Sequence, residues 1–164
     1  MKTNFLENNH VIHVAPAAVI AACEDFYDGA AGALIATDVI SLANADGAVF
    51  ILIQNANVGG NSSIRICACD NTTPTTTVAV SFKYKAIQAP NTILASGESV
   101  ALLTSTAADI VYVCEVDAAK VAEQGYKYCY LQSVEVTNNE VDGAVIAFLT
   151  GLRYKEDDAG SQVV

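Results

Sequence analysis

The chain has 164 residues, of which 52% are hydrophobic and only 16% are charged, and its formal net charge at pH 7 is -10. This length suits one domain whose core closes without a metal or a disulfide, and the apolar content excludes a disordered chain. The balance of 18 Asp and Glu against 8 Lys and Arg repels phosphate groups, which excludes nucleic acid and anionic membranes as favoured partners. We expect one globular domain with apolar surface left over for protein contacts.

Residues 1–14 are predicted to form an N-terminal arm. The arm lacks the continuous apolar run of a signal peptide, and no later run reaches the roughly 18 residues of a membrane-spanning helix, so we expect synthesis in a reducing cytoplasm. His10 and His13 would share one face of a helix, where they could bind a metal. The flanking Val11 and Ile12 favour a strand instead, on which the two imidazoles point to opposite faces. The pattern therefore predicts the edge of an N-terminal strand and no metal.

The segment after the arm fits two conformations. Pro16 suits the first turn of a helix over residues 16–27, and Gly29 lies just past its end. The alanines of this segment show little amphipathic contrast, so an extended arm fits as well. Glycines at 29 and 32 follow acidic residues that would repel a phosphate, and we expect a connector there.

The clearest strand pattern covers residues 78–85. Apolar residues alternate there with polar or small ones, as they do in a half-buried strand. The apolar set is Val78, Val80, Phe82 and Tyr84. Further strands are predicted at Val49–Ile53, 64–66, Ile110–Val116, Tyr126–Thr137 and Val141–Tyr154. No βαβ alternation is present, so the fold class is all-β, an antiparallel β-sandwich or jelly roll over residues 15–154, with a flexible acidic tail at 155–164.

Turn-forming residues separate these strands. Loops or turns are predicted at 57–63, 71–77, Gly97-Glu98 and Asn138-Asn139. The dipeptide Asp142-Gly143 lies inside a strand pattern and marks either a hairpin or a bulge. Asp117 is predicted to cap one or two helical turns over Ala118–Glu123, which stop at Gly125.

The chain has five cysteines, an odd number that lacks the paired C-x-x-C spacing of zinc ribbons and thioredoxin-like sites. They are Cys23, Cys67, Cys69, Cys114 and Cys129. Free cysteines are among the most buried residue types, so we expect them in the core. The alternative is that Cys67 and Cys69, which share one face of a strand, offer two ligands to a metal.

Two further groups of side chains invite a functional interpretation. Carboxylates at Glu115, Asp117 and Glu135 would suit a calcium site or an acid/base pair, although charges that protect a sheet edge are the simpler explanation. A row of aromatic residues with a spacing of two consists of Tyr126, Tyr128 and Tyr130. This row predicts core or subunit interface, and carbohydrate stacking is the alternative. No nucleophile, carboxylate or metal constellation is recognisable, so we expect no catalytic residues, no cofactor and no metal, and the chain is predicted not to be an enzyme.

Three segments of the C-terminal half form a recognisable set: Val111–Ala118 (VYVCEVDA), Tyr126–Leu131 (YKYCYL) and Gly143–Tyr154 (GAVIAFLTGLRY). Together they resemble small structural proteins of tailed bacteriophages. In the family a strand ending in E-V-D-A precedes a short turn, an aromatic strand and a closing strand that ends in G-x-R-Y. The N-terminal half is similar more loosely, through Asp38–Leu42, the apolar strand after Asp46-Gly47, and Phe82–Tyr84.

The resemblance implies a capsid cement, or decoration, protein. Such a protein would lie on the capsid exterior of the virion after synthesis in the host cytoplasm, and would stabilise contacts between subunits of the major capsid protein. Its partners would be that protein and neighbouring copies of itself, as a dimer or a trimer. Because capsid-binding sandwiches make contacts through loops and an N-terminal arm, the expected anchors are Phe5, Leu6, Val11 and Ile12. The alternatives are a tail, neck or fibre-associated sandwich of a phage, a carbohydrate-binding module, and an uncharacterised hydrolase.

Overall fold

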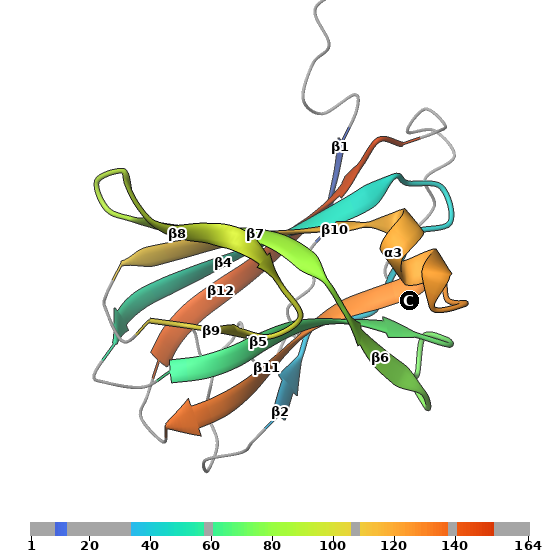
Figure 1. The fold of residues 1–164 in the computed structure, drawn as a ribbon, viewed down its shortest axis with the longest axis horizontal. Helices are drawn as coiled ribbons and strands as arrows, with labels where there is room; N and C mark the ends of the chain where they lie inside the picture. The colour runs from blue at the N-terminus through green and yellow to red at the C-terminus, as the bar shows by residue number, and fades with distance from the viewer. Residues whose placement is uncertain (1–8, 13–33, 58–60, 106–108, 138–140, 153–164) are drawn as a thin grey trace, which may run out of the picture.

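The structure is a computed structural model that describes residues 9–12, 34–57, 61–105, 109–137 and 141–152. Two antiparallel sheets face each other across the main core (Figure 1). The first sheet has the strand order β1-β12-β4-β10-β7-β8; the second has the order β2-β11-β5-β6, with β3 paired to β11 and β9 paired to β5. The strands of the first sheet are β1 (Asn9–Ile12), β4 (Gly47–Asn57), β7 (Phe82–Gln88), β8 (Thr92–Ser99), β10 (Ile110–Asp117) and β12 (Val141–Thr150). Those of the second are β2 (Leu34–Ala36), β3 (Ile40–Ser41), β5 (Asn61–Cys69), β6 (Thr77–Val80), β9 (Leu102–Leu103) and β11 (Tyr128–Thr137).

The predicted all-β, antiparallel sandwich is confirmed, and its core comes from the period-two pattern of the long strands. Along β10 buried and less buried residues alternate, which directs one side chain in two towards the second sheet. The largest buried side chains are Tyr112, Phe50, Phe82, Ile40, Leu52, Ile64, Ile66, Ile110 and Leu131, and they come from both sheets. Packing of these two inner faces holds the sheets together.

The predicted strand over residues 78–85 is wrong in one respect, because it is two strands in different sheets. Thr77–Val80 pairs with β5 in the second sheet, whereas Phe82–Gln88 pairs with β10 in the first, and the chain passes between the sheets at Ser81 (Figure 1). Val80 and Phe82 are both buried, so the apolar alternation continues through this corner although the strand does not. Periodicity alone cannot show such a change of sheet.

The turn predicted at Gly97-Glu98 is also wrong, since both residues lie inside β8. This edge strand is exposed along nearly its whole length, so it has no buried face. Its sequence therefore lacks the apolar alternation from which a strand could be predicted. Gly97 lies opposite Tyr84, and a Cβ added there would come 3.6 Å from Cε1 of that ring. The tyrosine thus packs over the glycine and supports a weak strand former at the edge.

The short helix predicted after β10 is confirmed as α3 (Ala118–Glu123). The Asp117 carboxylate caps it by accepting a hydrogen bond of 2.8 Å from the backbone N–H of Ala119, and Gly125, at φ +82°, follows its end. The irregularity at Asp142-Gly143 is a bulge, because the register between β12 and β4 shifts there. The predicted strands at Tyr126–Thr137 and Val141–Tyr154 are shorter than expected, since β11 starts at Tyr128 and β12 ends at Thr150.

A single backbone position explains why β12 stops. Gly151 has φ +62°, which is costly for any residue with a side chain, and a Cβ there would collide with the side chain of Asp46. Asp46 is itself fixed, because its N–H donates to the carbonyl of Thr150 and its carbonyl accepts from the N–H of Ala118. This close approach joins the ends of β12 and β10 to the start of β4.

Candidate interaction surfaces

The expected capsid anchors lie partly on an edge strand. Val11 and Ile12 belong to β1, where they pair with Phe148 and Ala147 of β12. Because β1 is the last strand of its sheet, only one of its edges is paired within the described part of the chain. Its sequence position and its place in the sheet confirm the predicted N-terminal edge strand, whereas Phe5 and Leu6 lie outside the described residues.

The predicted tyrosine row is divided by the fold. Tyr128 and Tyr130 lie on the side of the second sheet that is turned away from the first sheet. Cys69 and Cys67 lie directly opposite them on β5. Tyr126 precedes the strand and packs against the main core instead. The predicted row is therefore reduced to the pair Tyr128 and Tyr130. We name this pair, together with Cys67 and Cys69, the Tyr–Cys cluster.

The aromatic faces of the Tyr–Cys cluster are poorly placed for a sugar. Tyr130 is only 6% exposed, and the Lys127 ammonium lies over the half-buried ring of Tyr128, 5.2 Å from its centroid. Carbohydrate stacking needs a flat and accessible aromatic face. This arrangement favours the interpretation of the pair as a small packing cluster, whose other members are Val39, Ala36 and Ala79.

Four of the cysteines are buried and free, as predicted, while Cys23 lies outside the described residues. Burial raises the pKa of Cys69 to about 11, with the Asp70 charge adding to the effect, and burial raises that of Cys114 to about 12. Burial also raises the pKa of Cys129 and of Cys67. The thiols remain protonated at neutral pH, which makes them poor nucleophiles.

The thiols of Cys67 and Cys69 point to protein acceptors. The Cys67 Sγ lies 3.7 Å from Oε1 of Gln132, and the Cys69 Sγ lies 3.5 Å from the carbonyl oxygen of Asn71. Within the residues that the structure describes, no group of three or more His, Cys, Asp or Glu side chains could hold a metal ion. The geometry gives these two thiols a packing role.

The three carboxylates considered for calcium are separated. Glu115 and Asp117 are exposed at the end of β10 in the first sheet, while Glu135 belongs to β11 of the second. The Asp117 carboxylate is already engaged as the cap of α3. The fold therefore does not combine these groups into one site.

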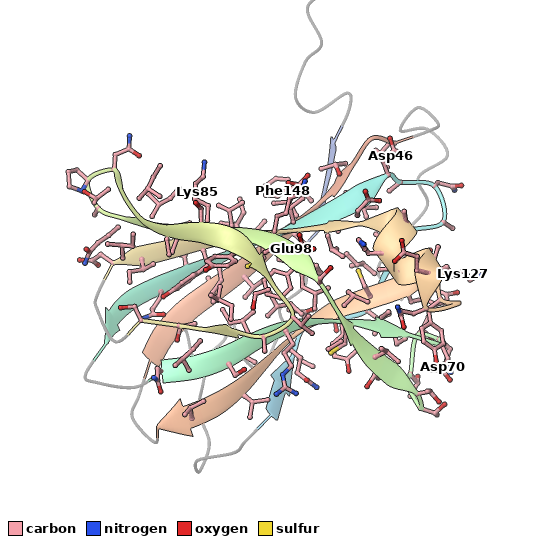
Figure 2. The ribbon with its side chains drawn as sticks, in the orientation of Figure 1. Asp46, Asp70, Lys85, Glu98, Lys127 and Phe148 are labelled. Atoms are coloured by element: carbon pink, nitrogen blue, oxygen red, sulfur yellow. The ribbon has the colours of Figure 1, made fainter. Side chains whose placement is uncertain are left out.

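The Thr-rich segment after β5 is an ordered loop organised by one carboxylate. Asp70 accepts hydrogen bonds from the Thr75 hydroxyl at 2.6 Å and from the backbone N–H groups of Thr75 and Thr76 at 3.1 and 3.2 Å. The Thr75 hydroxyl, followed by the backbone donors, lowers the pKa of Asp70 to about 2. The loop stands at one end of the sandwich, where Figure 2 labels Asp70. Because three hydrogen bonds of the loop converge on the Asp70 carboxylate, this carboxylate sets the shape of the loop.

Two open hollows flank α3, each of about 400 Å³. One is lined mainly by small and apolar groups around Tyr126 and Ala122, and the other by charges of both signs, among them Lys83, Glu98 and Lys120. Nothing in the sequence pointed to these hollows, because the residues that line them are far apart along the chain.

The outer face of the first sheet is unusually rich in aliphatic side chains. We use the name "outer face" for the side chains of β4, β7, β8, β10 and β12 that point away from the second sheet. Ile53, Ile146 and Ile93 on this face are 42%, 37% and 58% exposed. Figure 2 shows Lys85 and Phe148 projecting on the same side of the sheet. A sheet face that met only water would ordinarily carry polar side chains. The composition of the sequence predicted an apolar excess but did not show which part of the fold carries it.

The opposite end of the core from α3 contains buried polar contacts. The amide Nε2 of Gln54 donates to the carbonyl oxygen of Ser105 at 2.9 Å, and the Ser105 N–H donates to Oη of Tyr112 at 2.7 Å. A reciprocal pair joins Ser62 and Thr104, whose backbone N–H groups donate to the Thr104 hydroxyl and the Ser62 carbonyl. These bonds attach the segment before β10 to the ends of β4 and β5.

No helix within the described ranges has the length and apolar character needed to cross a bilayer. The sequence matches no protein-family model, and no curated protein matches it. Among solved structures, this chain is similar to the SPBc2 prophage-derived protein YomS, with 11% sequence identity and a TM-score of 0.47 over 91% of this chain and 98% of that one.

Proposed function

We propose that this protein is a non-enzymatic capsid cement protein of a tailed bacteriophage, which binds the outside of the head and joins neighbouring major capsid subunits. The observation that carries the proposal is the position of β1, an N-terminal strand held at the edge of the first sheet by β12. A strand in this position can pair with a strand of a partner through its second edge. The family resemblance of the segments at 111–118, 126–131 and 143–154 supports the same role.

The mechanism is additive. Each copy contributes a modest contact, but a protein that bridges two capsid subunits is released only when both contacts open together. Since the protein binds the assembled shell and not the free subunit, mass action stabilises the shell. The net charge of -10 keeps decorated particles from adhering to one another.

The test uses phage heads that lack this protein. Adding the purified full chain at saturation should raise the temperature at which the heads rupture, and a chain without residues 1–12 should keep its fold, measured by circular dichroism, but fail to sediment with heads. The matched control lacks residues 155–164 and should bind normally. An unchanged rupture temperature at saturating full-length protein would sink the proposal, and normal binding by the chain without residues 1–12 would remove β1 from the mechanism.

The alternative placement in the tail, neck or fibre is separated from this one by stoichiometry. A cement protein follows the many equivalent positions of the icosahedral shell, whereas a neck or tail component follows a small ring. Quantitative mass spectrometry of intact virions against the major capsid protein should therefore give a ratio near that of the shell positions. A ratio near that of the portal or tail proteins would favour the alternative.

A further inference from the structure

We propose that the outer face of the first sheet is the interface at which two copies of this chain form a two-fold symmetric dimer. The face lies on five neighbouring strands whose registers place its side chains in rows. One row is Ile93, Ile87, Val111, Ile53 and Ala144; the next is Ser96, Lys85, Val113, Ile51 and Ile146; the third is Glu98, Lys83, Glu115, Val49 and Phe148. The inference does not depend on the proposed role at the capsid.

The composition of these rows is that of a packed face and not of a solvated one. The first row contains no polar side chain, and the apolar residues continue along β4 and β12 through the second and third rows. A sheet with one solvated face normally alternates hydrophobic-in with polar-out. Here β4 has apolar side chains on both faces, since buried Phe50 and Leu52 alternate with Val49, Ile51 and Ile53. Strands of this kind are usually covered on both sides.

The area of the face agrees with a small specific dimer. Five strands about 4.8 Å apart, crossed by three rows about 6.8 Å apart, give roughly 500 Å² for each copy. Two such faces total roughly 1,000 Å², which is about the least that a specific interface buries and more than most crystal contacts bury. Two sheets packed face to face also reproduce the geometry of the sandwich itself. We therefore expect a dimer that dissociates measurably on dilution.

Charge selects a second copy as the occupant. The charged residues in the three rows are Lys83, Lys85, Glu98 and Glu115, so this face is neutral although the whole chain carries -10. Two copies can thus approach through it without the repulsion that their other surfaces would produce. A two-fold interface uses every contact twice, and a face with both lysines and glutamates can pair its charges with those of an identical face. One such face closes after two copies, which favours a dimer over a trimer.

The experiment is sedimentation velocity on the purified full chain from about 1 to 200 µM, the range in which an interface of this size should dissociate. The wild type should shift from monomer to dimer with concentration. Ile53→Lys combined with Ile146→Lys should remove the dimer while leaving the melting temperature nearly unchanged, because both side chains are already part exposed. The matched control is Leu103→Lys, which changes a residue that is 57% exposed on the second sheet and should dimerise like the wild type.

The charged residues of the outer face provide a second, independent variant. Lys83→Glu leaves three glutamates beside one lysine on the outer face and should weaken the dimer at low salt, with partial recovery at high salt. A wild-type monomer at every concentration would overturn the proposal, and so would a trimer, or a dimer that survives the double lysine substitution. If the wild type stays monomeric, binds phage heads and loses that binding on the double substitution, the face belongs to the capsid instead.

Discussion

The burial of the thiols makes a quantitative prediction about their chemistry. At pH 8 a cysteine with the ordinary pKa of 9.0 is about 10% thiolate, whereas Cys69, with a pKa of about 11, is roughly 0.1% thiolate, and Cys114, with a pKa of about 12, is roughly 0.01% thiolate. Ionisation alone therefore slows the reaction with a thiol reagent by about 100-fold at Cys69 and about 1,000-fold at Cys114. The lack of access to these buried sulfurs slows it further.

The assay follows the release of thionitrobenzoate from Ellman's reagent with native and guanidine-unfolded protein at pH 8. A Cys23→Ser background removes the thiol that lies outside the described residues. Peptide mapping after partial labelling should find Cys67 and Cys69 of the Tyr–Cys cluster modified before Cys114, because they belong to the smaller cluster on the outside of a sheet. Rapid reaction of two or more thiols in the native protein would refute the placement of the cysteines in the core.

The remaining predictions concern two local contacts, the approach of Gly151 to Asp46 and the hydrogen bond between Ser105 and Tyr112. Gly151→Ala should lower the free energy of unfolding by about 1–3 kcal/mol, and by more than the control Gly125→Ala does. Both positions need a positive φ, but only at Gly151 would the added Cβ also collide with the Asp46 side chain. Equal losses for the two variants in urea unfolding would contradict the role of this contact. Tyr112→Phe should cost about 1–2 kcal/mol, since it removes the hydroxyl that accepts from the Ser105 N–H and keeps the ring. An unfolding curve identical to that of the wild type would show that this bond contributes nothing.

Local chemistry made parts of the fold predictable. The cap at Asp117, the stop at Gly125 and the bulge near Gly143 follow from turn and capping residues that act within a few positions of the chain. The buried faces of β5 and β10 follow from the alternation of apolar side chains, which a half-buried strand imposes on its own sequence. These features depend on contacts that lie near one another along the chain.

Features that depend on partners far away in the sequence were missed. Nothing near Ser81 distinguishes a strand that continues from one that passes to the other sheet, because the inward side chains Val80 and Phe82 remain apolar in both cases. Strand β8 has no buried face, so within the described part of the chain its support comes from β7, through backbone pairing and the packing of Tyr84 over Gly97. The strands β2, β3 and β9 have three residues or fewer, which is too short for a periodic pattern.

The candidate sites show the same division. Burial of the cysteines was predicted from residue type alone, whereas the separation of Tyr126 from Tyr128 and Tyr130 required the start of β11, which a spacing of two does not reveal. The aliphatic outer face could be detected only as an excess in the composition. Its location needs the registers of five strands, because each strand contributes only three side chains.

The two proposed surfaces of the first sheet are adjacent, and this has a consequence for binding. Val11 of β1 pairs with Phe148, which ends the third row of the outer face, so the free edge of the sheet borders the proposed dimer interface. A two-fold dimer through the outer face would therefore carry two β1 edges as one rigid unit. If each edge binds one capsid subunit, the second contact forms at an effective concentration set by the dimer, and the dimer should bind a head far more tightly than the monomer does. The Ile53→Lys and Ile146→Lys variant, which retains β1, should consequently bind heads weakly although its edge strand is intact.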